Sequence, residues 1–393
     1  MALLVLSHFT AIASMDDIVG DTLGMRKTEK WYNKIWEYRK LANDPLAIDS
    51  FRNEYGDDYW KLAVMSGKLN LKDKSVKYPR FVKMCVDFYN WGDRTFNSYD
   101  TAYVVGTGKR WKLMVKNDNW IDFYNLKLPE SIHIGMASDI APNLSASISY
   151  MALSFSYMLN LDYMFGGEPV KHRRFDLNFS CSLIAFDVYY SKNLGNTNIT
   201  QLGDTYRNYN FFNSDYHFTG LTLESFGVDM YYFFNNKKYS QGAAYSYSKY
   251  QKRSAGSFIS GLTFSRQNVK MNFNTLPDEI IEELPADKRK YHVHYRDFCF
   301  MLGYGYNWVF RKNWLLNFTM IPCVGFNRSL NDTEERKKEM FSYNIKAKFA
   351  LVYNHNRFFY SMNGKFDGHF YRTNKYRFFN SYTNLAFVAG FRF

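Results

Sequence analysis

The sequence lacks the long apolar segments that cross membranes as helices. After its first residues, no segment contains the roughly 18 consecutive apolar residues that a membrane-spanning helix needs. This excludes a helical integral membrane protein.

Cysteine is also scarce. The four cysteines lie far apart, at Cys85, Cys181, Cys299 and Cys323. This spacing fits neither a disulfide scaffold nor a zinc site. Cys299 and Cys323 share one phase on neighbouring predicted strands, and an oxidising periplasm would permit a disulfide between them. We nevertheless expect free, buried thiols.

The charge balance is basic, but no nucleic-acid-binding motif accompanies it. The chain has 50 Lys and Arg against 37 Asp and Glu, a formal charge of +13. Without such a motif, the charge indicates outer-membrane lipid and lipopolysaccharide, or a small anionic solute, as partners. Basic surface residues without a specific role explain it equally well. No motif for a cofactor is present, and none is expected.

Aromatic residues are abundant instead. They make up 20% of the chain, with 33 Tyr and 36 Phe, although the mean hydropathy is −0.42. Many rings without apolar runs are typical of transmembrane strands, which face lipid on one side and a polar interior on the other.

From Trp111 onward the rings follow a period of two. In the last predicted strand one face carries Leu385, Phe387, Ala389, Phe391 and Phe393, and the other carries Asn384, Gly390 and Arg392. A soluble sandwich also alternates, but its apolar face is mostly aliphatic. Rings opposite small, amide and charged residues favour a membrane barrel.

The alternation predicts about twelve strands. Their expected ranges are 111–126, 131–138, 144–159, 175–190, 222–234, 243–250, 257–269, 294–310, 314–326, 341–353, 357–371 and 382–393. With the C-terminus in the periplasm, short and long connections should alternate. The long connection 191–221 breaks this rule, and the phase change at Met151-Ala152 predicts a bulge or an extra turn. Phe391 and Phe393 are the expected signal for the barrel-assembly machinery.

The region before the strands has a different texture. Residues 1–14 read as the end of a signal peptide, with Ala11-Ile12-Ala13 as a small-x-small cleavage pattern; a short buried helix is the alternative. Residues 15–108 are expected to form a partly helical periplasmic arm or a plug, with helices near 27–42 and 78–91. Residues 109–393 are the predicted barrel.

Four stretches carry a family resemblance. They are Tyr99-Asp100-Thr101-Ala102-Tyr103-Val104, Phe233-Phe234-Asn235-Asn236-Lys237-Lys238-Tyr239-Ser240, Gln251-Lys252-Arg253-Ser254-Ala255-Gly256-Ser257-Phe258 and Gly303-Tyr304-Gly305-Tyr306-Asn307. The chain resembles, over roughly residues 95–393, a Bacteroidetes family with domain of unknown function 4421. The resemblance implies an outer-membrane location in a Bacteroidetes-type cell, and it implies no activity or catalytic residue.

The interior of the predicted barrel is the candidate site. The phases place eight charged residues there: Asp176, Asp229, Asp297, Asp367, Lys346, Lys348, Lys365 and Arg392. They can interlock as salt bridges that close the barrel, or they can line a narrow polar path. We favour the salt bridges, because barrels of this size are often filled by side chains or a plug.

Two smaller patterns have possible chemistry. Asp367 and His369 share one face with Ser361, and a carboxylate can orient an imidazole as a general base. However, no Gly-x-Ser-x-Gly motif is present, so we expect a buried structural histidine. His292 and His294 have a spacing that can hold a metal on a strand, but no third ligand is near, and we expect surface histidines and no metal.

These observations predict an all-β fold, a single antiparallel transmembrane barrel of about twelve strands with a partly helical N-terminal arm. The leading functional hypothesis is an outer-membrane barrel for passive, porin-like solute passage or for scaffolding in the envelope. An outer-membrane hydrolase acting on lipid or peptide, and a soluble β-rich protein that binds an anionic ligand, are the two alternatives.

Overall fold

The computed structural model describes residues 31–393 with internal gaps. The gaps are residues 66–70, 97, 110, 129–131, 151–152, 161–171, 195–196, 204–205, 208–215, 277–285, 287–288, 331–339 and 373–375. The predicted signal peptide, residues 1–14, lies outside the described residues. The chain consists of two compact units, with the boundary between Thr95 and Phe96.

The first unit is helical. Its helices are α3 (Trp31–Leu41), α4 (Pro45–Tyr55), α5 (Tyr59–Met65) and α6 (Arg80–Phe96), with a 3-10 turn at Gly56–Asp58. Asp44 caps α4 by accepting a hydrogen bond from Leu46 N. A small core packs between the helices, formed by Tyr38, Phe51, Tyr59, Leu62, Ala63 and Val76. Among the described helices, none has both the length and the apolar character to cross a membrane.

The second unit consists mainly of antiparallel strands. The strands are β1 (Val104–Gly106), β2 (Trp111–Lys127), β3 (His133–Ser138), β4 (Ala141–Tyr150), β5 (Leu153–Asn160), β6 (His172–Ser180), β7 (Ile184–Leu194), β8 (Thr197–Leu202), β9 (Tyr206–Arg207), β10 (His217–Phe218), β11 (Leu221–Phe233), β12 (Lys249–Gln251), β13 (Ala255–Asn272), β14 (Lys290–Arg311), β15 (Trp314–Ser329), β16 (Met340–His355), β17 (Phe358–Arg372) and β18 (Arg377–Arg392). The short helix α8 (Gln241–Ala244) precedes β12. The predicted all-β, antiparallel character is confirmed for this unit.

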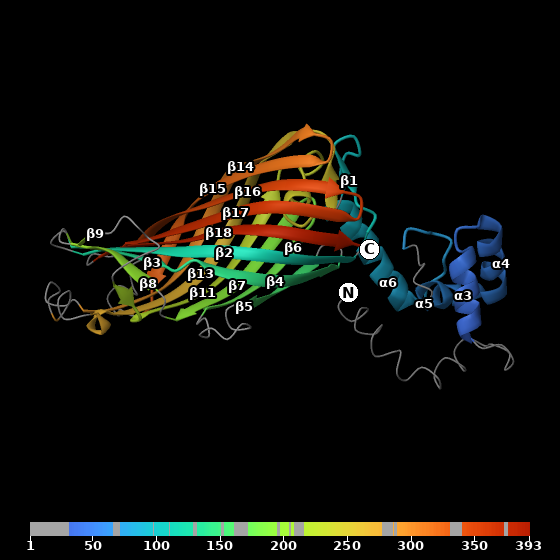
Figure 1. Cartoon of the computed structure of the whole chain (residues 1–393). Coiled ribbons are helices and arrows are strands. Elements are labelled where there is room, and N and C mark those ends of the chain that lie inside the picture. The colour runs from blue at the N-terminus through green and yellow to red at the C-terminus, as the bar shows by residue number, and fades with distance from the viewer. Residues whose placement is uncertain are drawn as a thin grey trace. The chain divides into compact units, whose positions relative to one another are not determined.

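Most of these strands belong to one curled sheet (Figure 1). Starting from β2, the pairing order is β18, β17, β16, β15, β14, β13, β11, β7, β6, β5 and β4. β4 in turn pairs with β2, from Trp111 opposite Tyr150 to Trp120 opposite Ala141. The sheet also includes four short strands, β3, β8, β9 and β10. Of these, β3 pairs with the C-terminal end of β2.

The connections differ at the two ends of the sheet. Short connections lie at the end that also holds the C-terminus, here called the turn end: residues 181–183, 312–313 and 356–357. Asn313 (φ 70°) and Asn356 (φ 50°) take the left-handed conformation that tight hairpins need. A longer connection follows β13 at the opposite end, here called the loop end, and begins with the 3-10 turn Phe273–Thr275.

Three of the predicted strand ranges were wrong. The range 144–159 is two strands, β4 and β5, and 175–190 is also two, β6 and β7. The range 243–250 contains the end of α8 and the start of β12, and β12 pairs with β1 instead of the large sheet. The range 131–138 does contain a strand, β3, but this strand lies outside the order from β2 to β4. The predicted connection 191–221 contains the end of β7 and the short strands β8, β9 and β10, and β8 pairs with β3.

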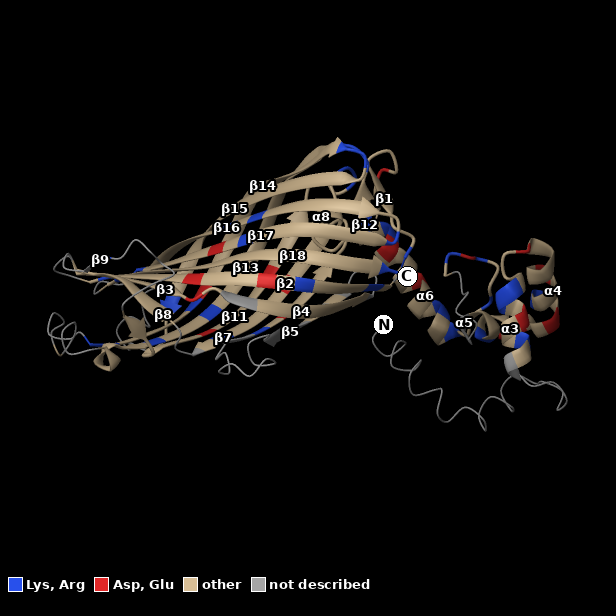
Figure 2. Ribbon diagram, in the orientation of Figure 1, with Lys and Arg blue, Asp and Glu red and all other residues tan. Residues whose placement is uncertain are grey.

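The two faces of the sheet match the predicted phases. On the convex face, rings are exposed: Phe298 is 54% exposed, Phe318 64% and Phe387 49%. On the concave face, Lys346 is 2% exposed and Arg392 is fully buried. Figure 2 shows that charged residues are few along the strands. The sheet therefore turns rings outward and encloses small, amide and charged side chains.

Candidate functional site: the interior of the sheet

The middle of the interior holds a cluster of ion pairs. Lys346 on β16 and Asp367 on β17 are direct cross-strand partners, so their side chains share the inner face. Lys346 Nζ lies 2.9 Å from Asp229 Oδ2 and 3.6 Å from Asp367 Oδ1. Lys365 Nζ lies 2.8 Å from Asp367 Oδ2. Two lysines and two aspartates from β11, β16 and β17 thus neutralise one another.

Neutral groups complete the hydrogen bonding of Asp229. Thr263 Oγ1 donates to Asp229 Oδ1 (2.5 Å), and Tyr231 OH donates to Asp229 Oδ2 (3.2 Å). Asp229 is fully buried. A buried carboxylate is stable only when ion pairs and hydrogen bonds satisfy it, and this one has both.

Two further ion pairs flank the central cluster. Arg174 donates two hydrogen bonds to Asp176, of 2.8 and 3.0 Å, and its guanidinium lies 4.3 Å from the ring centre of Tyr382. Lys348 Nζ lies 3.1 Å from Asp187 Oδ2. A cavity of about 110 Å³ lies beside Arg174; such a volume holds a few water molecules.

The turn end is filled by a segment of the chain itself. Residues 234–254, here called the inward segment, connect β11 to β13 and include α8 and β12. Amide and phenol groups hold it against the inner face: Tyr245 OH donates to Asn317 Oδ1 (2.6 Å), and Asn317 Nδ2 donates to Tyr239 OH (3.1 Å). The ring of Tyr247 stacks on Phe359 with a centroid distance of 4.4 Å.

Arg392 fixes the inward segment from the last strand. Its Nε donates to Tyr247 O (2.9 Å), and its other nitrogens donate to Tyr250 OH and Asn354 Oδ1. Lys112 on β2 donates to Ser246 O. Arg392 was predicted to lie among the other interior charges. Instead, it donates hydrogen bonds to the inward segment at the turn end.

The inward segment is also tied to the chain that enters the sheet. β1 pairs with β12, from Val104 opposite Gln251 to Gly106 opposite Lys249. Asp100 N donates to Lys237 O (2.8 Å). The stretch before β2 therefore closes the turn end together with the inward segment.

The four stretches that carry the family resemblance meet in this one place. Asn307 Nδ2 donates to Ser240 O (2.9 Å) and to Gln251 Oε1 (3.0 Å), and β1 carries the first stretch onto β12. At Gly305, a Cβ atom would lie 2.6 Å from Tyr239 OH. Glycine therefore permits Tyr239 to approach β14.

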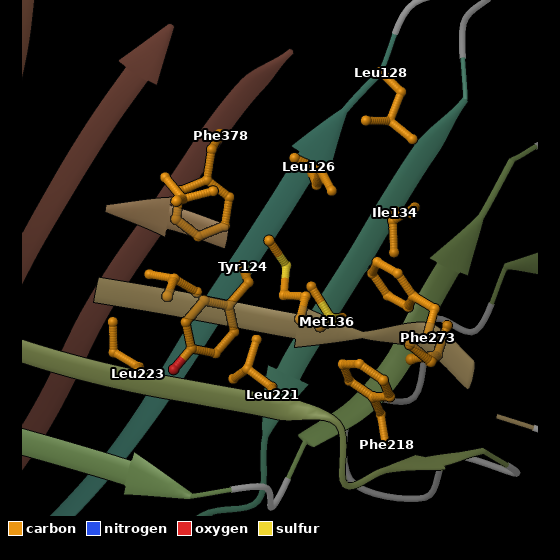
Figure 3. Close-up of a cluster of buried hydrophobic side chains, with 14 of the residues drawn as sticks. Tyr124, Leu126, Leu128, Ile134, Met136, Phe218, Leu221, Leu223, Phe273 and Phe378 are labelled. Atoms are coloured by element: carbon orange, nitrogen blue, oxygen red, sulfur yellow. The ribbon is translucent and has the colours of Figure 1, made fainter. Parts of the chain in front are cut away.

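The loop end is closed by apolar side chains. The short strands β3, β8 and β10 bring Ile134, Ile199 and Phe218 into contact with residues of the large sheet, and all three are fully buried. Figure 3 shows Tyr124, Phe378 and Leu223 converging on the same cluster. The interior thus has three layers: apolar at the loop end, ionic in the middle, and amide and phenol at the turn end.

The geometry gives no support to catalysis at Asp367 and His369. The Asp367 carboxylate is bound by two lysines, and His369 Nδ1 has no hydrogen-bond partner within the described chain. Ser361 Oγ donates to Asn363 instead (2.7 Å). The imidazole therefore lacks the orienting carboxylate that a general base needs.

The other candidate residues have structural partners. His292 Nε2 donates a hydrogen bond to Asn268 Oδ1 (2.7 Å), and His294 Nε2 accepts a hydrogen bond from Arg266 (3.0 Å). The described residues contain no group of three or more potential metal ligands. Cys299 and Cys323 are free thiols. They are not direct partners, since Cys299 pairs with Gly325 and Cys323 with Met301.

The structure brings together only part of the predicted charge set. Asp229, Lys346, Lys365 and Asp367 form one cluster, whereas Asp176 and Lys348 pair with Arg174 and Asp187, which the sequence analysis did not single out. Asp297 accepts a hydrogen bond from Asn344. Arg174 has the same alternating phase as Asp176, so the phase was the available signal for it. Asp187 lies on β7, which was predicted as one strand with β6, and its odd spacing from Asp176 put it on the opposite face of that strand.

A family model and several solved structures match the chain. The model described as Domain of unknown function (DUF4421) matches residues 98–393. No curated protein sequence matches. Three of the similar structures are the outer membrane protease OmpT from Escherichia coli (TM-score 0.29, 8% identity, 76% of this chain and 99% of that one), the translocator domain of the autotransporter NalP from Neisseria meningitidis (0.28, 10%, 80% and 96%) and the P. putida toluene transporter TodX (0.25, 6%, 72% and 90%). TM-scores this low carry no functional argument, so the function has to be argued from the chain's own residues.

Proposed function

The chain belongs to the DUF4421 family, a family without an assigned activity, and we propose from its own residues that it is an outer-membrane barrel with a closed interior. Its role is that of an envelope scaffold, which anchors the helical unit of residues 31–95 to the membrane. The β2–β4 pairing supports closure of the twelve strands from β2 to β4 into a barrel, and their antiparallel order and even number suit an outer-membrane barrel.

A band of exposed rings supports the membrane location. On β14 every second residue from Phe298 to Phe310 is apolar or aromatic and at least 43% exposed. At about 3.3 Å per residue and a strand tilt of about 40°, this band spans roughly 30 Å, close to the hydrocarbon thickness of a bilayer. Exposed arginines, Arg296 and Arg311, follow at the two ends of the band.

Orientation follows from the connections. In outer-membrane barrels the short turns face the periplasm and the long loops face outward. On this ground we propose that the turn end, the C-terminus and the chain that leads to the helical unit lie in the periplasm. Phe393 is 53% exposed and its ring lies 6.0 Å from that of Phe391; the two rings are the proposed contact for the barrel-assembly machinery.

The filled interior is the observation that carries the scaffold role. Porin-like passage needs a continuous wet path. Here the three interior layers lie along that path, and their central residues, Asp229 and Lys346, are 0% and 2% exposed. Charges that are paired and buried in this way hold strands together rather than conduct solutes.

Two measurements on the purified full chain test this proposal. The chain should require detergent for extraction, and its gel mobility should change on heating, as expected of a folded barrel. In planar bilayers it should give no steady conductance. Steady conductance would refute the scaffold role and leave passive passage, and extraction without detergent would leave the soluble alternative.

Gated passage is a second candidate, favoured by one observation. The inward segment belongs to a connection, and its contacts with the wall are side-chain hydrogen bonds, such as those of Arg392 and Asn317. If it is a gate, the double variant Arg392→Ala/Tyr247→Ala should show conductance events. Arg377→Ala, on the same strand but exposed at the loop end, is the matched control and should stay silent. Silence of both variants leaves the scaffold.

A further inference from the structure

Three arginines form a row across neighbouring strands on the outer face, near the loop end. Arg266 on β13 is directly opposite Arg296 on β14, and Arg296 is directly opposite Arg328 on β15. All three are exposed. Direct cross-strand partners have Cβ atoms about 5 Å apart, and like charges in such pairs destabilise a sheet. A bound anion removes this repulsion.

A row of phenyl rings runs beside the arginines. It lies two residues closer to the turn end, about 7 Å along each strand, and consists of Phe264, Phe298, Phe326 and Phe341, paired directly with one another. These rings are 37–63% exposed. In the proposed barrel they mark the outer edge of the hydrocarbon, so the arginine row lies at the level of the outer headgroups.

The surroundings of the row are basic. Lys270 and His292 are direct partners on the same two strands, four residues beyond Arg266 and Arg296 towards the loop end. The carboxylate of Glu224 is the acidic group on the adjacent β11, but it lies opposite Lys192 and accepts a hydrogen bond from Tyr190 (2.7 Å). Glu224 is thus not a direct cross-strand partner of any of the three arginines.

We propose that Arg266, Arg296 and Arg328 bind a phosphate of an outer-leaflet glycolipid, the chemistry of lipid A in lipopolysaccharide. Guanidinium groups bind phosphate oxygens through paired N–H donors, and the neighbouring rings contact the acyl chains of the same molecule. The proposal rests on the outer-membrane barrel proposed above. It assigns a lipid site to strands β13–β15, not to the loops.

The test measures lipid retained by the full chain after detergent exchange. The variant Arg266→Gln/Arg296→Gln/Arg328→Gln removes the row. The control Arg311→Gln/Lys312→Gln/Arg357→Gln removes the same charge from exposed residues at the turn end. The probes are lipid A, enzymatically dephosphorylated lipid A and inorganic phosphate.

The expected result is retention of lipid A by the wild type and the control, with at least a tenfold loss in the row variant. Dephosphorylated lipid should be retained at least tenfold less than lipid A by the wild type. Equal retention of the dephosphorylated lipid would overturn phosphate recognition. Displacement of lipid A by millimolar inorganic phosphate would overturn the lipid source and assign the row to free phosphate.

A stability measurement separates this proposal from the barrel itself. In lipid-free detergent, Arg296→Gln should unfold at the same or a higher temperature than the wild type, because it relieves like-charge repulsion. With lipid A present, the order should reverse. If the wild type fails to retain lipid A but keeps its heat-modifiable gel mobility, only the proposal for the arginine row is refuted. If the wild type shows no heat-modifiable mobility, the proposed function itself is refuted.

Discussion

Replacing Lys346 by methionine removes the ammonium group that lies between two buried carboxylates. In the wild type, Lys346 Nζ is 2.9 Å from Asp229 and 3.6 Å from Asp367. Methionine keeps most of the side-chain volume but none of the charge. Lys365 still neutralises Asp367 in this variant, whereas Asp229 keeps only its neutral donors.

The expected cost is about 3–5 kcal/mol of unfolding free energy, because breaking a buried pair leaves an uncompensated charge. If the interior were a wet channel, solvent would screen the charges and the cost would be about 1 kcal/mol or less. The two cases differ by far more than the error of a urea titration.

The assay is the urea midpoint of the heat-modifiable gel band for the detergent-solubilised full chain. The double variant Lys346→Met/Asp229→Asn is the control, since it removes one cation and one anion together, keeps the Lys365–Asp367 pair and should recover most of the lost stability. An unchanged midpoint for Lys346→Met would refute the buried ion-pair cluster.

Three further predictions concern other parts of the chain. Phe318→Arg, in the middle of the ring band, should lower barrel stability by about 2–4 kcal/mol in lipid vesicles, whereas Phe358→Arg, beside a turn, should lower it by about 1 kcal/mol or less; equal effects would contradict the band. In the helical unit, burial raises the pKa of Asp73, but hydrogen bonds from Ser75 and the charge of Arg52 outweigh it and hold that pKa below its usual value. This stabilisation is present at neutral pH and lost as the pH falls through the folded-state pKa, so Asp73→Asn should cost about 1 kcal/mol at pH 7, and the melting curves of the helical signal in circular dichroism should converge in acid. Finally, a maleimide should label Cys85 before the buried thiols Cys181, Cys299 and Cys323, since burial also raises the pKa of Cys181 to about 11; rapid labelling of Cys299 would indicate an open interior.

The sequence was sufficient to predict which residues of the strands face inward and which face outward. Where a strand is long and regular, as from Phe298 to Phe310, the period of two separates exposed rings from buried partners such as Cys299 and Asn307. The same phase placed Asp229, Lys346 and Asp367 together inside.

Strand ends were harder to predict, because one hairpin lacks the strongest turn signals and one internal segment looks like a strand. The hairpin Cys181-Ser182-Leu183 contains no Gly, Pro or Asn, so β6 and β7 were joined into one strand. The stretch 243–250 alternates rings with small residues like a strand. In the structure, Tyr247 takes a positive φ of 52° and its ring packs against the inner wall.

The partners of the interior charges were beyond a single sequence. Arg174 and Tyr382, or Lys348 and Asp187, lie on strands that are distant along the chain and come together only when the sheet curls. The role of Arg392 likewise depends on a segment that was predicted to be part of the wall.

Spin labels at two adjacent positions of β15 test the membrane-spanning barrel most directly. Phe318 is 64% exposed and Thr319 is 1% exposed. With the full chain in lipid vesicles, a label at position 318 should collide readily with oxygen, which concentrates in hydrocarbon, and a label at position 319 should be shielded from oxygen and from a water-soluble relaxing agent. A label at position 318 that meets the water-soluble agent more than oxygen would contradict the barrel.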